Sequence, residues 1–361
     1  MVNDKELKEI KKVAVVLFNL GGPDNLAAVK PFLFNLFYDR AIINLPNPFR
    51  FFLAKFISSK REKEAAKIYS LIGGKSPILE ETEQQRLALE KQLNLQNDSK
   101  KYKVFIAMRY YKPYIADTHK QVLDFFPDEV VLLPLYPHFS TTTTGSSFVE
   151  WDKLCGKESR FTTRKICCYY DNDLFIDAHV KKIEESYAKI TDKKNIRILF
   201  SAHGLPQKIV DSGDPYQFQI KESCRLIVDQ LGKKTDLNLD WQVCYQSKVG
   251  PLKWLTPSTK DELIRAGKER KSVIIVPISF VSEHSETLVE LDIEYKHFAH
   301  ENGIKDYFRV ETLSLAENYI ACLKDLSAVD IAVDKNVDKF VGRSIIKICP
   351  ADFSQCPCRK K

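Results

Sequence analysis

The chain has 361 residues, 44% of them hydrophobic and 29% charged, which is typical of a globular protein, and its length favours two domains. Its net charge of +7 is spread along the sequence without a basic tail, so nucleic-acid binding is not expected. The first ten residues lack the apolar core of a signal peptide, which argues against secretion.

Short apolar runs alternate with helical patterns along most of the chain. The expected strands are Val13–Leu20, Lys103–Tyr110, Glu129–Tyr136, Arg164–Tyr170, Ile196–Ser201, Trp241–Gln246, Ser272–Phe280 and Phe308–Leu315. The expected helices include Glu81–Leu93, Tyr114–Phe126, Leu174–Lys189, Gln217–Leu231 and Thr259–Ala266. This alternation predicts an α/β protein of two Rossmann-like, doubly wound parallel-sheet domains that face each other across a cleft. We expect these domains at residues 12–170 and 171–325, followed by a C-terminal extension at residues 326–361.

The segment at about residues 32–60 is rich in phenylalanine and leucine. Its charged residues and its prolines, Pro46 and Pro48, exclude a transmembrane helix. The aromatic residues stand beside lysines and arginines, which fits an interfacial contact with a membrane or an apolar lip of a binding site. A pair of ordinary core helices fits the same pattern, and the sequence alone does not separate these readings.

Doubly wound folds bind ligands beyond the carboxyl ends of their strands, where this chain has several small or polar residues. Gly21 and Gly22 follow the first strand, but the turn lacks the third glycine of a dinucleotide fingerprint, which disfavours a nicotinamide enzyme. The polar segment 141–147 suits a carboxylate-binding site or a plain helix N-cap. His203 ends another strand, where an imidazole can take protons near neutral pH, although an isolated histidine is more commonly a core or loop residue.

A row of acidic residues follows the strand expected at 272–280. Glu286, Glu290 and Glu294 recur every four residues on a helical pattern, with Glu283 and His284 at the head of the row. Carboxylates at this spacing repel each other, and no lysine or arginine lies among them. Such a row with an imidazole at its mouth suits a divalent cation such as Fe²⁺. A solvated helix face is the alternative reading.

Three cysteines near the C-terminus form the pattern Cys-x6-Cys-x-Cys, at Cys349, Cys356 and Cys358. An odd total of nine cysteines in a long chain does not indicate a disulfide framework, so we expect a reducing compartment, most simply a bacterial cytoplasm. Clustered thiols there favour zinc or an iron–sulfur cluster. The candidates for a fourth ligand are Cys155, Cys167, Cys168, Cys224, Cys244 and Cys322.

The motifs taken together resemble those of the ferrochelatases. They run in order from 19–23 (Asn-Leu-Gly-Gly-Pro) through 71–77, 108–110, 135–137, 143–147, 200–206 (Phe-Ser-Ala-His-Gly-Leu-Pro), 246–251 (Gln-Ser-Lys-Val-Gly-Pro) and 282–288 to 291–295 (Leu-Asp-Ile-Glu-Tyr). The resemblance covers nearly the whole chain beyond the first dozen residues. The combination is highly specific, although each piece alone is not.

The resemblance implies insertion of Fe²⁺ into protoporphyrin IX, the terminal step of haem synthesis. It makes His203 the acceptor of pyrrole protons or a metal ligand, with Glu286 as its partner across the cleft. His284, Glu290 and Glu294 match the family's polar row for metal passage or proton removal, and this row is often wound as a π-helix.

The resemblance also implies a wall of residues that line the macrocycle or hold its propionates. These are Leu20, Tyr69, Ser76, Arg109, Tyr110, Trp254 and Phe280. The segment at 32–60 then becomes a lip through which an apolar porphyrin enters. A protein of this kind is expected in the cytoplasm, associated peripherally with the inner membrane.

For the cysteines, the resemblance is to bacterial ferrochelatases with a [2Fe–2S] cluster, because Thr141 or a neighbour stands at the fourth-ligand position of the animal enzymes. The fourth cysteine of the bacterial variant lies shortly after that segment. Cys155 fits this position best, and Cys167 and Cys168 remain open. The predicted ligand set is therefore Cys155, Cys349, Cys356 and Cys358.

Other functions stay open at this stage. A coproporphyrin ferrochelatase, or a chelatase for cobalt or nickel and another tetrapyrrole, would share the fold and His203. A non-catalytic haem or metal carrier would bind porphyrin without turnover, and an iron–sulfur regulatory protein would function without His203. Both a monomer and a homodimer are compatible with the sequence.

Overall fold

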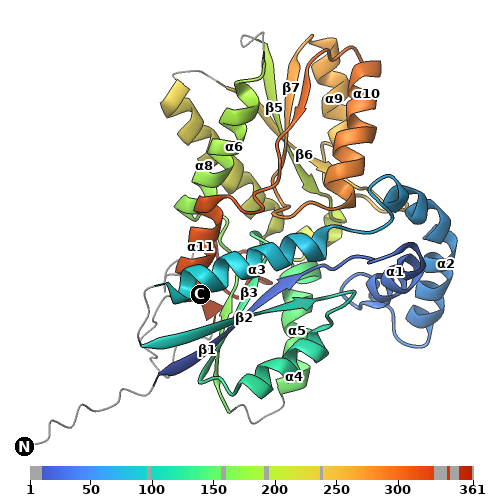
Figure 1. Ribbon diagram of the computed structural model, residues 1–361. Helices are drawn as coiled ribbons and strands as arrows, with labels where there is room; N and C mark the ends of the chain where they lie inside the picture. Colours follow the sequence, from blue (N-terminus) through green and yellow to red (C-terminus); the bar gives the residue numbers. More distant parts are fainter. Residues whose placement is uncertain are drawn as a thin grey trace, which may run out of the picture.

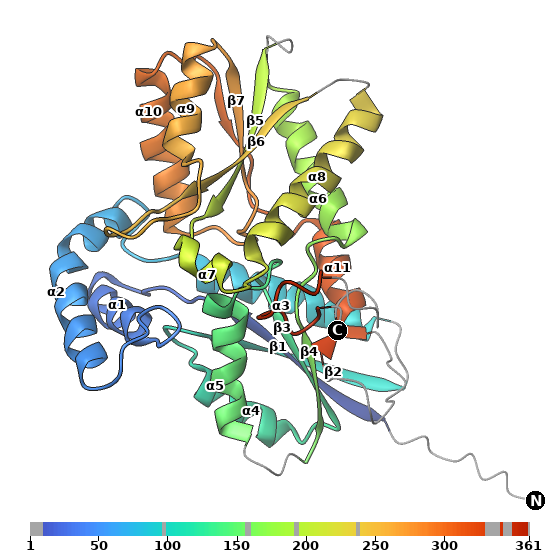
Figure 2. The same cartoon turned by 180° about the vertical axis from the view of Figure 1, so that it is seen from behind.

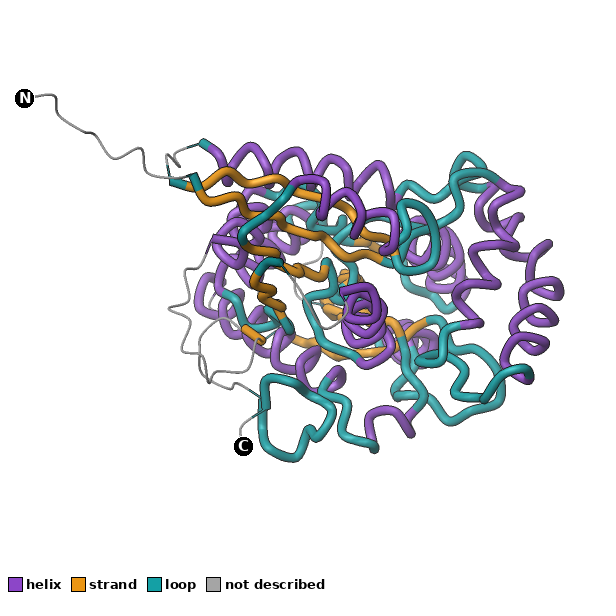
Figure 3. Tube along the Cα trace, turned by 90° about the horizontal axis from the view of Figure 1, so that it is seen from below, coloured by secondary structure: helices purple, strands orange, loops and turns teal. Residues whose placement is uncertain are grey.

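The protein is described by a computed structural model for residues 10–95, 99–155, 160–190, 195–235, 239–328, 340–341 and 349–359. Two parallel β-sheets lie one above the other, each covered by helices (Figure 1). Seen from below, the strands lie inside a shell of helices and loops (Figure 3). The predicted α/β architecture with two parallel sheets is confirmed.

The first sheet has the strand order β2-β1-β3-β4-β9, and all of its pairs are parallel. Its strands are β1 (Lys11–Asn19), β2 (Lys100–Met108), β3 (Glu129–Pro134), β4 (Thr162–Ile166) and β9 (Phe340–Val341). The second sheet has the order β6-β5-β7-β8, also parallel. Its strands are β5 (Ile196–His203), β6 (Asp240–Gln246), β7 (Ser272–Pro277) and β8 (Tyr307–Arg309).

Most of the connections between strands are helical, as crossovers between parallel strands require. The α-helices are α1 (Val29–Tyr38), α2 (Phe49–Ser70), α3 (Ile78–Asn94), α4 (Ile115–Phe125), α5 (Ser146–Cys155), α6 (Asp173–Tyr187), α7 (Gln207–Asp211), α8 (Tyr216–Thr235), α9 (Thr259–Lys268), α10 (Lys296–Glu301) and α11 (Glu317–Ala328). Two short π-helices, η2 (Thr141–Gly145) and η3 (Glu286–Tyr295), follow strands β3 and β7.

Alternate residues of β1 enter two different cores, as the pleat of a strand dictates. Val16 and Phe18 pack with Trp151 under α4 and α5, on one face of the first sheet. Val15 packs on the other face into a larger core that also contains Phe200 of β5. Helices α3, α6 and α11 contribute to this larger core, which joins the two halves of the protein (Figures 1 and 2).

Six of the eight expected strands end earlier than predicted, whereas β6 ends at Gln246 as expected and β5 continues beyond Ser201 to His203. The strand expected to reach Leu315 stops at Arg309, and the one expected to reach Phe280 stops at Pro277. Val310 and Leu313 are nevertheless fully buried, because they fill the shared core after leaving the sheet. Hydrophobicity therefore marked burial correctly but not the end of strand pairing.

The lip segment contains α1 and α2, which project to one side of the molecule (Figure 1). Its inner residues pack together, but Phe49, Phe52 and Phe56 are 67%, 64% and 65% exposed. The reading of these three side chains as core residues is therefore wrong. Among the described residues, no helix is long and apolar enough to cross a membrane.

Candidate active site

His203 is the last residue of β5, at the carboxyl end of the second sheet. Its Nδ1 lies 2.8 Å from Oε2 of Glu286, and its side chain remains 39% exposed. Burial lowers the pKa of His203, but the Glu286 carboxylate outweighs burial, so the net pKa lies above the ordinary value. The structure thus places an imidazole and a carboxylate in contact, with one edge of the imidazole open.

Glu286 is ionised at neutral pH although its side chain is largely buried, with 25% of it exposed. Burial raises the pKa of its carboxyl group, but His203, His284 and a hydrogen bond from Ser247 lower it to about 2. Nε2 of His284 is 3.9 Å from the other oxygen of Glu286. His284 is itself buried, and burial lowers its pKa, so it lies beside Glu286 as a neutral ring.

Aromatic rings border His203 on two sides. The ring centroids of Trp254 and Phe280 both lie 6.5 Å from that of His203. Gly204 permits the approach of Trp254, because a Cβ at position 204 would come within 3.0 Å of the indole ring. The indole Nε1 of Trp254 is buried without a hydrogen-bond partner. The site therefore combines an apolar border with one basic nitrogen and one carboxylate.

The acidic row lies on the π-helix η3, which confirms the winding that the resemblance implied. Glu290 receives hydrogen bonds from the hydroxyl of Tyr295 at 2.8 Å and the amide of Ser247 at 3.0 Å. Burial and the neighbouring Glu286 raise its pKa. Glu294 is exposed at the far end of the helix. The row thus leads from solvent at Glu294 to the imidazole at His203.

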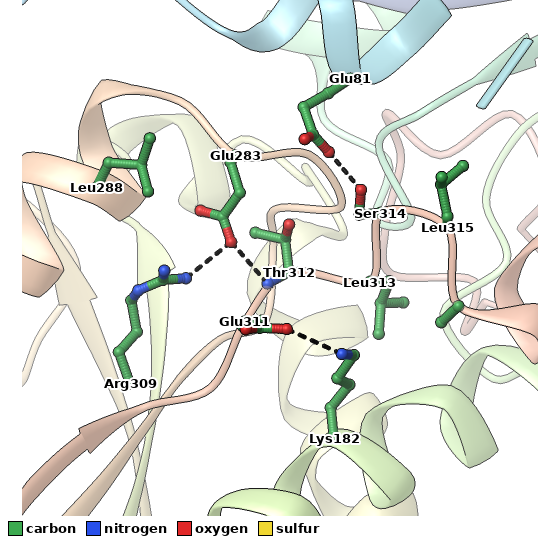
Figure 4. A pocket seen from close by; sticks show the side chains of 11 residues that line it. Glu81, Lys182, Glu283, Leu288, Arg309, Glu311, Thr312, Leu313, Ser314 and Leu315 are labelled. Carbon is green, nitrogen blue, oxygen red and sulfur yellow. Dashed lines mark hydrogen bonds and ion pairs between the residues drawn. The ribbon is translucent and has the colours of Figure 1, made fainter. Parts of the chain in front are cut away.

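Glu283 does not belong to this row. Its Oε1 accepts hydrogen bonds from Arg309 at 2.9 Å and from the amide of Thr312 at 3.0 Å (Figure 4). Arg309, which also pairs with Asp292 at 2.7 Å, comes from β8 and supplies the positive charge that the acidic stretch itself lacks. Glu283 lines a separate cavity of about 540 Å³, which none of the predicted porphyrin-contacting residues line.

On the opposite wall, a buried carboxylate fixes the predicted propionate-binding residues. Asp39 accepts from the guanidinium of Arg109 at 2.9 Å and from the hydroxyl of Tyr110 at 2.8 Å. Burial, strengthened by Asp39, raises the pKa of Tyr110. Arg109 also donates to Ser146 at 2.8 Å. Tyr110 is only 2% exposed, so it holds the wall together more than it lines an open surface.

Three other predicted substrate-binding residues lie near the same wall. Tyr69, at the end of α2, lies near Ser285, directly before Glu286, and burial raises its pKa to about 12. Leu20 packs partly buried in the same cluster as Tyr69. Ser76 is buried against Gly22, where a Cβ would lie 2.5 Å from that of Ser76. Tyr69 thus brings the end of α2 near the start of the acidic row.

The polar segment after β3 binds a carboxylate of the protein itself. The amide and hydroxyl of Thr141 donate to Oδ2 of Asp214 at 2.7 and 2.8 Å. Ser140, whose hydroxyl also donates to Asp214, caps the π-helix η2. The segment thus holds Asp214, a fully buried residue that was not predicted, and the N-cap is Ser140, one residue before the segment.

Five cysteines from two distant parts of the chain meet in one buried cluster, which we term the thiol cluster. They are Cys167, Cys168, Cys349, Cys356 and Cys358. Gln219 donates to the sulfurs of Cys168 and Cys349 at 3.5 and 3.2 Å. Hydrogen bonds from Cys168 and Cys356 lower the pKa of Cys349 to about 3, whereas burial raises that of Cys167.

Cys155 lies outside the thiol cluster. Its sulfur is 3.7 Å from Nε2 of His119, and it packs against the core under α4 and α5. Cys167 and Cys168, which were left open, are the cysteines that the fold brings to the C-terminal thiols. Across the described ranges, no group of three or more His, Cys, Asp or Glu side chains is arranged to hold a metal ion as it stands.

Sequence reasoning missed Ser247, Tyr295 and Asp39, which hold the acidic side chains and the basic wall in place. Ser247 lies in the motif at 246–251, so a signal was present, but its role depends on a contact with η3 about 40 residues later. Asp39 gave no local signal, because its partners Arg109 and Tyr110 are about 70 residues away.

Comparison with known proteins identifies the family. The family model described as Ferrochelatase matches residues 12–330. The chain belongs to the ferrochelatase family. It is 54% identical to a ferrochelatase of Rickettsia bellii (strain OSU 85-389) over 351 residues, 96% of this chain and 95% of that protein. It is 57% identical over 318 residues to a ferrochelatase of Wolbachia sp. subsp. Drosophila simulans (strain wRi), 87% of this chain and 98% of that protein.

Membership in this family makes the chain an enzyme that inserts iron into a porphyrin in haem synthesis. Among solved structures, SirB from Bacillus subtilis with Fe³⁺ matches with a TM-score of 0.50 and 10% identity, covering 88% of this chain and 96% of that one. At so low an identity the match shows a shared fold, and it agrees with the two parallel sheets described above.

Proposed function

We propose that this ferrochelatase inserts Fe²⁺ into protoporphyrin IX and that His203 accepts the pyrrole protons. The observation that supports this role most directly is the 2.8 Å contact between Nδ1 of His203 and Glu286 at the end of β5. Because an ionised carboxylate only accepts hydrogen bonds, Nδ1 is the donor, and Nε2 is left as the basic nitrogen. Glu286 then stabilises the imidazolium that forms when Nε2 takes a proton.

The acidic row supplies the route for the metal in this proposal. Fe²⁺ enters at the exposed Glu294, passes Glu290 and reaches Glu286 and His203, which are oxygen and nitrogen ligands suited to this ion. His284, neutral and buried beside Glu286, keeps the inner end of the row polar without adding positive charge that would oppose the metal.

The porphyrin lies, in this proposal, between the aromatic border of His203 and the opposite wall. Trp254 and Phe280 contact the macrocycle beside His203, and Arg109 faces a propionate. Leu20, which is only partly buried, supplies a further contact, and the buried Tyr69, Ser76 and Tyr110 support this wall from behind. A ring held bent by these walls would expose the lone pairs of its nitrogens to the arriving ion, which is a form of ground-state strain.

The lip segment supports a peripheral membrane contact and a preference for an apolar porphyrin. Phe49, Phe52 and Phe56 recur on one face of α2, and Lys60 and Lys63 continue that face and are exposed. Aromatic side chains followed by lysines suit insertion into a lipid surface with cationic groups at the headgroups. We place the enzyme in the cytoplasm at the inner membrane on this ground.

We also propose a [2Fe–2S] cluster at the thiol cluster, held by Cys349, Cys356 and Cys358 with a fourth thiolate from Cys167 or Cys168. Five cysteines gathered in one buried cluster, with Gln219 donating to the sulfurs of Cys168 and Cys349, fit a thiolate-bound group. This ligand set replaces Cys155, whose sulfur lies with His119 instead. A bound cluster would supply a redox-active centre that fastens the C-terminal segment to the first sheet.

The substrate preference is tested by anaerobic kinetics with Fe²⁺ and either protoporphyrin IX or coproporphyrin III. The apolar lip predicts a higher kcat/KM for protoporphyrin IX, because coproporphyrin carries additional carboxylates that must be desolvated. A higher kcat/KM for coproporphyrin III would assign the enzyme to that substrate and overturn the proposal. If Phe52→Ser and the wild-type enzyme showed the same ratio of kcat/KM values for the two porphyrins, the lip would have no part in substrate preference.

A further inference from the structure

Ser247, directly after β6, adopts a backbone conformation that non-glycine residues rarely take. Its φ is +63°, in the left-handed region. Phe126 and Arg270 share such a φ, but they stand where α4 and α9 end, a usual place for it. Ser247 instead ends a strand beside the acidic row, and strained residues at such places commonly serve a function.

The left-handed turn aims both polar groups of Ser247 at the acidic row. Its amide donates to Oε1 of Glu290 at 3.0 Å. Its hydroxyl oxygen lies 2.6 Å from Oε2 of Glu290 and 2.9 Å from Oε2 of Glu286. The hydroxyl has one hydrogen and so donates to one carboxylate at a time, and its oxygen lies between two carboxylates that belong to successive turns of η3 and that would otherwise repel each other.

The same contacts reach the imidazole of His203. Oε2 of Glu286, which accepts from the hydroxyl of Ser247, is also the atom 2.8 Å from Nδ1 of His203. A shift of that oxygen therefore moves the partner of His203 as well. Tyr295 and Gln246 donate to Glu290 but not to Glu286, so they cannot couple the two carboxylates in this way.

We propose that Ser247 is a positioning residue for metal transfer along the acidic row. Its hydroxyl holds Glu286 and Glu290 together before Fe²⁺ arrives, and a divalent cation passing between the carboxylates replaces the hydroxyl there or binds its oxygen as a further ligand. The proposal rests on the function of the row given above. It assigns to Ser247 no contact with the porphyrin and no proton transfer.

Two substitutions separate the hydroxyl from the backbone. Ser247→Gly removes the hydroxyl, keeps the amide donor and adopts a positive φ freely. Ser247→Ala removes the hydroxyl and keeps the strain. Arg270→Gly is the control, because Arg270 is exposed, has a φ of +55° and lies after α9, away from the acidic row.

Steady-state insertion is measured anaerobically with each variant while Fe²⁺ and protoporphyrin IX are varied in turn. Both Ser247 variants should raise the KM for Fe²⁺ about tenfold, the effect of one lost hydrogen bond to a charged group, and leave the KM for porphyrin unchanged. Arg270→Gly should match the wild type in both constants. Thermal unfolding of each variant shows that the fold is retained.

A wild-type KM for Fe²⁺ in both Ser247 variants would overturn the proposal. An effect in Ser247→Ala that is absent in Ser247→Gly would overturn it too, because strain and not the hydroxyl would then be responsible. A change confined to thermal stability would reduce Ser247 to a structural residue. If the wild-type enzyme inserts no iron, the proposed function fails first, and this outcome is distinct from all of these.

Discussion

The acidic row and the thiol cluster both gather like groups in buried surroundings, but the protein stabilises them in different ways. Two carboxylates of the row are stabilised by hydrogen bonds. His203 donates to Glu286, and Ser247 and Tyr295 donate to Glu290. The thiols contact each other and accept hydrogen bonds from Gln219, and burial raises the pKa of Cys167. The row is therefore held by hydrogen bonds from neighbouring side chains, whereas the thiols are gathered mainly by packing, and among the described residues neither group forms a three-ligand metal site.

The two sites also differ in how the chain builds them. The row lies on one π-helix and needs only the adjacent ends of β5 and β6 to complete it. The thiol cluster joins residues 167–168 to residues 349–358, so it depends on the docking of the C-terminal segment onto the first sheet. Substitutions in the thiol cluster should accordingly lower the rate of iron insertion less than substitutions of His203.

The largest expected effect follows from His203→Ala. Removal of the proton acceptor should lower kcat about 10²- to 10⁴-fold, the usual contribution of general base catalysis, without unfolding the protein. Insertion is followed anaerobically by the loss of porphyrin fluorescence, and His297→Ala, at an exposed position on α10, is the control. Near-normal turnover in the His203 variant would remove this residue from the catalytic role.

Glu286→Gln should have the next largest effect, a fall in kcat of about 10²-fold, because an amide cannot stabilise the imidazolium of His203 as a carboxylate does. The shape of the side chain is preserved, so porphyrin binding should persist. Glu301→Gln, on an exposed acidic side chain beyond the row, provides the matched control. Equal rates for the two variants would discount the acidic row.

The thiol cluster is tested by Cys349→Ser and Cys155→Ser. We expect anaerobically purified wild-type protein to contain two iron atoms and two acid-labile sulfides per [2Fe–2S] cluster, with a visible absorbance. Cys349→Ser should lose the iron and the sulfide, and Cys155→Ser should keep them, since Cys155 lies beside His119. Loss of the cluster in Cys155→Ser would restore Cys155 as a ligand, and bound zinc without sulfide in the wild type would refute the cluster.

A smaller effect concerns two buried histidines that belong to neither site. Burial lowers the pKa values of His138 and His179 to about 3, with His179 contributing to the shift of His138. Unfolded histidines titrate near pH 6.5, so the unfolded state binds more protons between about pH 3 and 6.5. The free energy of unfolding should therefore fall as the pH drops through this window.

In His179→Leu, the slope of the free energy of unfolding against pH should be smaller by the equivalent of about one proton. The slope is measured by urea unfolding at several pH values. Both ring nitrogens of His179 are buried without hydrogen-bond partners, so leucine loses no contact of that kind. His297→Gln, at an exposed position, should leave the slope unchanged. An unchanged slope in His179→Leu would show that this ring is protonated in the folded state.

The sequence predicted the fold because its signals are local, whereas His203 and Glu286 were paired through the resemblance to the ferrochelatases, and their catalytic role stays a prediction. Buried parallel strands are continuous apolar runs, and His203 and Glu286 each follow such a run. Cys155 was chosen by its distance along the chain, but β4 carries the chain on to Cys167 and Cys168, which lie where the C-terminal segment docks. The salt bridge of Arg309 with Glu283 was likewise invisible, since it joins β8 to the segment before η3.

The most direct test of the account is anaerobic turnover of the purified protein with protoporphyrin IX and Fe²⁺. Loss of porphyrin fluorescence and the appearance of haem absorbance are followed together over a range of Fe²⁺ concentrations. The account predicts protein-dependent insertion that saturates in both substrates. Tight porphyrin binding without any insertion, in protein shown to be folded, would contradict it and indicate a carrier or a chelatase for another metal.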